Sequence, residues 1–303
     1  MLDQHIENIV SLLNTDNSHT WDYLEGFFYR VILEIYKLTN NEKFFEYTSE
    51  YYNEFIKLSF TEHENKYDIL MNAYSLFTLF EQSNNEKYLE ASKQVYQLFV
   101  ELPKTSAGLL DSQEFFILLD NCKVLFFAIR YANYYHDDNL WVLIKKQILI
   151  IKELFYCKTS KLYRQKLIEE SYSLNDLGFF AILLIDFLDL NYDKEVYDIF
   201  IELISGVEQY LSSNMWSQTI VNKQEGLLSE VSGTALLCYV FLYGNKKGFL
   251  SPKYFVKGID IFHHLQNNFF NEDKEVYKLI SNQDYFKMSP YFLIYIFLKR
   301  VQK

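Results

Sequence analysis

The sequence predicts an all-α protein built from helical hairpins. Its 303 residues include only 9 Gly and 3 Pro, whereas half are hydrophobic and 18% are aromatic. So few turn-forming residues argue against a β-sandwich, a Gly-rich phosphate loop and a disordered chain. Apolar residues at helical spacing fill long stretches of the sequence, and short polar turns separate these stretches.

The polar turns recur at intervals of roughly 44 to 55 residues, which suggests an internal repeat. They are TNNEKF at 39–44, SNNEKY at 83–88, HDDNLW at 136–141, NYDKEVY at 191–197 and GNKKGFLSPKYF from 244. Each interval holds two helices, and such a pair cannot bury both of its faces without neighbouring pairs. No linker or low-complexity segment interrupts the series, so we expect one domain over 1–303.

The two helices of each pair differ in character. The first is apolar on nearly all sides, in the segments 23–38, 70–80, 118–131 and 175–190. The second carries more charge, in the segments 45–56, 88–100, 140–155 and 196–211. This contrast predicts buried inner helices and partly exposed outer helices. An open solenoid would keep a solvated stripe on its concave helices, so the pattern favours a closed ring with a funnel-shaped pocket at one end.

Charge and composition argue against several functions. The net charge of −11 and the presence of only four Arg disfavour nucleic-acid binding. The three Cys and six His lack metal-ligand spacing, so we expect neither a metal nor another cofactor. The longest purely apolar run, 179–185, is too short to cross a membrane. The acidic first residues do not resemble a secretory signal, and we expect a cytoplasmic protein. The sequence does not determine the oligomeric state.

Acidic residues near the starts of the apolar helices are the candidate catalytic groups. Asp120 lies in FILLDNCKVLFF, where apolar neighbours should partly desolvate its carboxyl group, as general acid catalysis requires. The alternative is a carboxylate that caps the helix or reaches solvent. Asp68 is a similar candidate, with a helix N-cap as its alternative. Glu230 precedes VSGTALLCYVF and could instead pair with Lys223.

The order of the segments resembles the unsaturated glucuronyl and rhamnogalacturonyl hydrolases of glycoside hydrolase families 88 and 105. TWDYLEGFFYRVILEIYKL is similar to the opening Trp, Gly and Tyr pattern of these families, and YDILMNAYSLF follows with Asp68 at an active-site aspartate. After LPKTSAG, the segment FILLDN has Asp120 at the position of the catalytic aspartate. GLLSEVSGTALL is similar to their Glu-x-Ser-Gly-Ser/Thr-Ala segment. The resemblance extends over about 20–270.

This resemblance implies an (α/α)6 barrel and a specific reaction. The families remove a terminal 4,5-unsaturated uronic acid from oligosaccharides left by polysaccharide lyases, without a metal. An aspartate protonates the vinyl ether and then helps water attack C5, so that the ring opens. We therefore expect Asp120 and Asp68 to be catalytic. The substrate-binding candidates are Trp21, Arg164, Tyr172, Trp216 and Glu230, and the two Trp are equally consistent with core packing.

Four departures from the family pattern favour an alternative. Leu118 replaces a Trp, and Leu162–Tyr163–Arg164 lacks the His of the family. Ser173 and Asn175 replace Trp and Arg, and FKMSPYFL replaces a His-Gly-x-Gly segment. Arg164 or Lys287 could supply the missing basic group. The alternative is a catalytically inactive relative that binds a saccharide or a protein, and an unrelated helical-repeat scaffold is a third possibility. An active enzyme requires Asp68 and Asp120 to lie close together.

Overall fold

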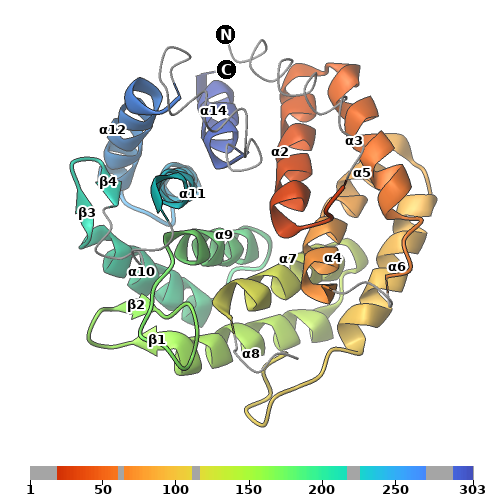
Figure 1. The fold of residues 1–303 in the computed structure, drawn as a ribbon, viewed down its shortest axis with the longest axis horizontal. Coiled ribbons are helices and arrows are strands. Elements are labelled where there is room, and N and C mark those ends of the chain that lie inside the picture. The colour runs from red at the N-terminus through yellow and green to blue at the C-terminus, as the bar shows by residue number, and fades with distance from the viewer. Residues whose placement is uncertain (1–18, 61–64, 111–116, 217–225, 271–288, 303) are drawn as a thin grey trace.

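The computed structural model describes residues 19–60, 65–110, 117–216, 226–270 and 289–302. Its helices form two concentric layers (Figure 1). The inner helices are α2 (Tyr23–Thr39), α4 (Lys66–Ala73) with its continuation α5 (Leu76–Ser83), α7 (Leu118–Tyr135), α9 (Leu174–Leu190), α11 (Gly226–Lys246) and α14 (Ser289–Gln302). The outer helices are α3 (Glu42–Phe55), α6 (Lys87–Val100), α8 (Asp138–Phe155), α10 (Lys194–Glu208) and α12 (Pro252–Asn268).

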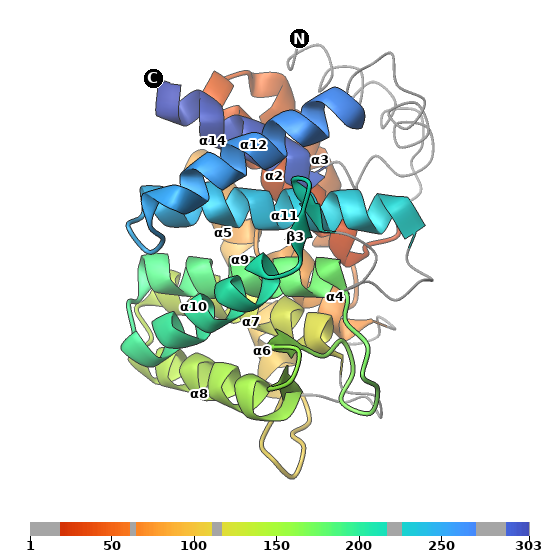
Figure 2. The ribbon, with the colours of Figure 1, turned by 90° about the vertical axis from the view of Figure 1, so that its left-hand side faces the viewer.

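The inner layer closes on itself. Helix α2 packs against α4, α4 against α7, and the series continues through α9, α11 and α14 back to α2. The fold is therefore an (α/α)6 barrel, as the sequence predicted, and an open helical-repeat scaffold is excluded. Figure 2 shows the barrel from the side, across its axis. None of the helices in the described ranges combines the length and apolarity needed to cross a membrane.

The predicted polar turns connect inner helices to outer helices. Asn40, Asn84 and His136 adopt left-handed backbone conformations at the ends of α2, α5 and α7. The Asp137 side chain then caps α8, and Asp193 caps α10 in the corresponding turn after α9. Because each inner helix reverses directly into an outer one, the inner helices run in the same direction. Their N-terminal ends therefore gather at one end of the barrel.

The structure departs from the predicted helices in two places. The stretch expected to be one helix over 70–80 breaks between α4 and α5, where the Tyr52 hydroxyl donates to the Asn72 carbonyl (2.8 Å). In an unbroken helix that carbonyl would accept a hydrogen bond from the backbone N–H four residues later. Two short antiparallel hairpins also join outer helices to inner ones: β1 (Tyr156–Cys157) with β2 (Leu162–Tyr163), and β3 (Leu211–Ser212) with β4 (Met215–Trp216). Two-residue strands are too short to show a periodic pattern.

Side chains from opposite sides of the ring fill the barrel axis. Phe179 of α9 makes edge contacts with Phe27 of α2 and Phe126 of α7, at centroid distances of 5.1 and 6.5 Å. Further toward the C-terminal ends, Arg30 of α2 forms an ion pair with Asp186 of α9 (2.7 Å). This aromatic layer divides the interior into two polar ends, each built from different turns of the same helices.

The buried Asn72 side chain joins the starts of two inner helices. Its Nδ2 donates to the carbonyls of Trp21 (3.0 Å) and Asp22 (3.2 Å) before α2, and to that of Asp68 (2.9 Å) within α4. The Tyr51 hydroxyl of outer helix α3 donates to Asn72 Oδ1 (2.6 Å). One amide therefore sets the position of α2 relative to α4 at the N-terminal end of the barrel.

We expect Asn72→Ala to lower the free energy of unfolding by about 3 kcal/mol, because it leaves several buried polar groups without partners. Urea denaturation of the variant and the wild type measures this difference. Gln82→Ala is the matched control, since it removes an exposed amide from α5 and should leave stability nearly unchanged. A loss for Asn72→Ala as small as that for the control would contradict the role assigned to Asn72.

Candidate active site

Four successive inner helices carry an acidic residue at their third helical position. These residues are Glu25 in α2, Asp68 in α4, Asp120 in α7 and Asp176 in α9. The first turn of a helix favours negative charge because its backbone N–H groups and macrodipole are positive there. The N-terminal end of the barrel is therefore lined by carboxyl groups, and all four are buried.

Asp68 and Asp120 converge on one lysine. Lys123 Nζ lies 2.8 Å from Asp68 Oδ1 and 2.9 Å from Asp120 Oδ1. The three residues are 7%, 8% and 5% exposed for Asp68, Asp120 and Lys123 respectively. The structure thus brings together the two aspartates that the sequence singled out, although they are separated by one complete hairpin along the chain. It also adds a cation between them.

Burial and charge act in opposite directions within this cluster. Burial raises the pKa of Asp68 above its ordinary value, and the neighbouring Lys123 ammonium offsets part of that effect. For Lys123, burial lowers the pKa, but the carboxylates of Asp120 and Asp68 outweigh it and raise the pKa overall. Lys123 therefore stays charged, while Asp68 is a carboxyl group that burial makes easier to protonate.

Neighbouring side chains orient the cluster. Asn65, the N-cap of α4, donates from Nδ2 to Asp68 Oδ2 (2.6 Å) and accepts from the Asp68 backbone N–H. The N-cap is therefore Asn65, and the alternative that Asp68 is a helix N-cap is wrong. Tyr23 places its ring 4.5 Å from Lys123 Nζ and also contacts Phe179, the residue at the centre of the aromatic layer.

Trp21 packs beside the cluster rather than within it. Its indole lies against Tyr51 and Phe55 of α3 and against His19, at centroid distances of 4.9, 5.8 and 4.8 Å. Its backbone N–H donates to Glu25 Oε2 (2.8 Å). Trp21 is partly buried, so part of the side chain remains accessible at this end of the barrel.

Arg164 and Tyr172 lie in the segment between α8 and α9. The backbone of this segment reaches the start of α7, because Leu118 N–H donates to the Gln165 carbonyl (3.0 Å). Arg164 is partly buried and forms no ion pair with a residue in the described ranges. The Tyr172 hydroxyl accepts from Ser160 Oγ (2.8 Å), and burial raises the pKa of Tyr172 to about 12.

Glu230 and Trp216 are buried in different ways. Glu230 is 5% exposed, burial raises its pKa, and its Oε1 has no hydrogen-bond partner among the described residues. Its alternative partner, Lys223, lies outside the described residues, as does Lys287. Trp216 is completely buried, and its Nε1–H donates to the Val207 carbonyl (2.7 Å). Trp216 therefore occupies a core position and has no surface with which to contact a substrate.

Sequence reasoning missed Lys123 and Tyr23. Lys123 lies in the apolar stretch of α7, one helical turn after Asp120, and that i,i+3 spacing to an acid was an available signal. Tyr23 carried no signal that separated it from the many core aromatics. Within the described residues, no three His, Cys, Asp or Glu side chains are grouped as a metal site would require.

Comparisons with known proteins agree with this fold. A family model described as Glycosyl Hydrolase Family 88 matches residues 2–176. The structure is similar to a glycoside hydrolase from family 105 of C. acetobutylicum, with 15% identity, a TM-score of 0.76, and coverage of 96% of this chain and 97% of that one. No curated protein gives a significant sequence match.

Two further solved structures have the same fold. A glycosyl hydrolase family 88 protein from Bacteroides vulgatus is 13% identical, with a TM-score of 0.75 and coverage of 98% of this chain and 99% of that one. An unsaturated glucuronyl hydrolase specific for heparin is 11% identical, with a TM-score of 0.72 and coverage of 93% and 86%. At such identities the structural similarity shows the fold, whereas the family model extends over more than half of the chain. This protein therefore belongs to glycosyl hydrolase family 88.

Proposed function

We propose that this protein is a glycoside hydrolase that removes a terminal 4,5-unsaturated uronic acid from oligosaccharides produced by polysaccharide lyases. The observation that carries the proposal is the pairing of Asp120 and Asp68 across Lys123 at the N-terminal end of the barrel. One structurally similar protein is an unsaturated glucuronyl hydrolase, which supports the same substrate class.

The reaction needs a carboxyl group that first donates a proton and then accepts one. In the proposed mechanism Asp120 protonates C4 of the vinyl ether, and water adds to C5 as the same carboxylate takes up its proton. The product is a hemiketal at C5, whose C5–O5 bond breaks to give a ketone. The hemiacetal left at C1 then breaks down to an aldehyde and releases the alcohol of the next sugar, so that the glycosidic bond is cleaved. This sequence differs from displacement at the anomeric carbon by two separate carboxylates.

The cluster is suited to holding one exchangeable proton. With both carboxyl groups ionised, two negative charges face one ammonium, so one carboxyl can be protonated while the other keeps its ion pair with Lys123. In this proposal the proton rests on Asp68, whose pKa burial raises, and Asp120 donates it to the substrate. In this role Lys123 also supplies positive charge for the substrate carboxylate in a chain whose net charge is −11.

The remaining substrate contacts come from the rim around the cluster. Tyr23 offers a ring next to Lys123, while Arg164 and Tyr172 belong to the segment before α9, whose Gln165 carbonyl accepts from the Leu118 N–H at the start of α7. Trp21 and Glu230 complete the proposed binding residues. The thiols of Cys122, Cys157 and Cys238 are unpaired, which is typical of a reducing compartment and supports a cytoplasmic location for the proposed reaction.

We expect Asp120→Asn to lower kcat at least about 100-fold, because the amide cannot donate the proton. The assay follows the loss of ultraviolet absorbance of the double bond in a panel of unsaturated uronyl disaccharides. Asp198→Asn, an exposed acid on outer helix α10, is the matched control and should turn over like the wild type. Turnover by Asp120→Asn at the wild-type rate would remove Asp120 from the mechanism.

The pH profile tests the role of Lys123. A proton held by Asp68 is lost as the pH rises through the raised pKa of that group, so turnover should fall on the alkaline side. Lys123→Met removes the cation that lowers this pKa, so the alkaline limb should move to higher pH, and KM should rise as the positive charge is lost. Lys93→Met, on the exposed side of α6, is the control. A limb that stays in place or moves to lower pH contradicts this role.

One observation favours the alternative of an inactive relative that binds a saccharide. Lys123 already neutralises part of the charge of both aspartates, which also stabilises the cluster in a form that does not donate a proton. In that case calorimetry should detect saturable binding of an unsaturated disaccharide that the wild type does not consume. Measurable turnover that depends on Asp120 rules out this alternative.

A further inference from the structure

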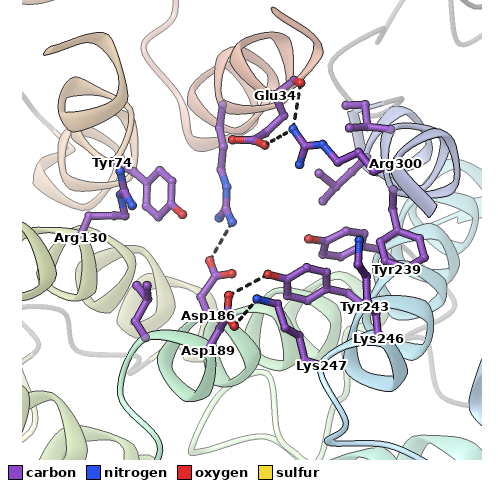
Figure 3. Close-up of a pocket in the computed structure, with 15 residues that line it drawn as sticks. Glu34, Tyr74, Arg130, Asp186, Asp189, Tyr239, Tyr243, Lys246, Lys247 and Arg300 are labelled. Carbon is purple, nitrogen blue, oxygen red and sulfur yellow. Dashed lines mark hydrogen bonds and ion pairs between the residues drawn. The ribbon is translucent and has the colours of Figure 1, made fainter. Parts of the chain in front are cut away.

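A cavity lies at the opposite end of the barrel from Asp120. It has a volume of about 350 Å³, and residues near the C-terminal ends of α2, α7, α9, α11 and α14 line it (Figure 3). Tyr74, at the end of α4, completes the wall. The aromatic layer around Phe179 lies between this cavity and the Asp68–Lys123–Asp120 cluster, so the two polar ends are separate.

The charge of the cavity is opposite to that of the chain. Its lining includes five cationic side chains and three acidic ones, a surplus of two positive charges, whereas the whole chain has a net charge of −11. The cationic residues are Arg30, Arg130, Lys246, Lys247 and Arg300. Three of the four Arg in the sequence therefore meet in one cavity, and Arg is the side chain best suited to bidentate binding of carboxylate or phosphate.

Ion pairs within the lining account for only three of the five cations. Arg30 pairs with Asp186 (2.7 Å), Arg300 with Glu34 (2.9 Å) and Lys247 with Asp189 (2.5 Å). These pairs use all three acidic residues of the cavity.

Arg130 and Lys246 are the two cations left over. Arg130 pairs with an acid that does not line the cavity: its Nη2 lies 3.5 Å from Oε1 of the partly exposed Glu81. Lys246 forms no ion pair with a described residue and lies 5.4 Å from the Phe297 ring centroid. Arg130 therefore has only this long contact with an acid outside the lining, and Lys246 has no ion pair with a described residue.

Two of the arginines also retain buried donors. Arg30 Nη1 and Arg130 Nε are buried and have no hydrogen-bond acceptor among the described residues. Both guanidinium groups lie against the same ring, that of Tyr74, at 4.2 and 5.4 Å from its centroid. The two guanidinium groups carry like charges on the same ring, and each has a buried N–H group without an acceptor. A bound anion would offset the repulsion between these charges and accept from these donors.

We propose that this cavity binds a small organic anion carrying a carboxylate or a phosphate group. Its volume is near the lower end of the range for small-molecule sites, about 300–1,000 Å³, which suits one sugar-sized molecule rather than an oligosaccharide chain. Arg30 and Arg130, whose buried donors lie beside Tyr74, bind the anionic group, and Lys246, on the opposite side of the cavity in Figure 3, adds positive charge to the site. The hydroxyl-bearing rings of Tyr74, Tyr239 and Tyr243 line the rest of the cavity. This site is independent of the hydrolase activity proposed above.

Isothermal titration calorimetry of the full chain tests this proposal. The wild type is titrated separately with inorganic phosphate and with citrate, in chloride buffer at constant ionic strength. We expect saturable binding of one anion per chain, and weakening by about tenfold in each of Arg130→Gln and Lys246→Gln. Lys146→Gln removes the same charge from the exposed side of α8 and should bind like the wild type. Asp120→Asn should also bind like the wild type.

Each outcome bears on the proposal. Binding of phosphate alone identifies a phosphate ester as the ligand class, whereas binding of citrate alone identifies a carboxylate. Binding that Arg130→Gln and Lys246→Gln leave unchanged overturns the proposal, as does equal weakening by Lys146→Gln. The absence of saturable binding by both anions also overturns it. Weakening by Asp120→Asn would instead assign the anion to the other end of the barrel.

Discussion

Ring closure is the constraint on which the other features of this structure depend. Inner helices that are apolar on nearly every side can be buried on all faces only when each has an inner neighbour on both sides and an outer helix behind it. The packing of α14 against α2 supplies the last of these contacts. The inner helices run in one direction because each returns through an outer helix, and closure gathers their N-terminal ends at one end of the barrel and their C-terminal ends at the other.

The two ends consequently have opposite chemistry. The positive ends of the helix dipoles carry acids such as Asp68 and Asp120, while the negative ends carry cations such as Lys246 and Arg300. The aromatic layer around Phe179 keeps these groups apart within the barrel. A single arrangement of helices thus provides a buried cluster of carboxyl groups around Lys123 at one end and a cation-rich cavity at the other.

The site could be predicted from the sequence in part. The position of Asp120 and Asp68 near the starts of apolar helices indicated acids at one end of a barrel, and the structure places their carboxyl groups on a shared lysine. Lys123 was missed because the sequence shows a lysine in an apolar run without showing which acid of another hairpin it meets. The break after α4 was also missed, because it depends on a hydroxyl from Tyr52, far away in the sequence.

The sequence by itself determined the helical class, the pairing of inner and outer helices and the turns between them. These features follow from local composition and periodicity, which act over one or two helical turns. Only the tertiary structure decided which side chains meet on the barrel axis, from Lys123 with its two aspartates to Arg30 with Asp186. Such contacts join residues from different hairpins, and ring closure brings them within bonding distance.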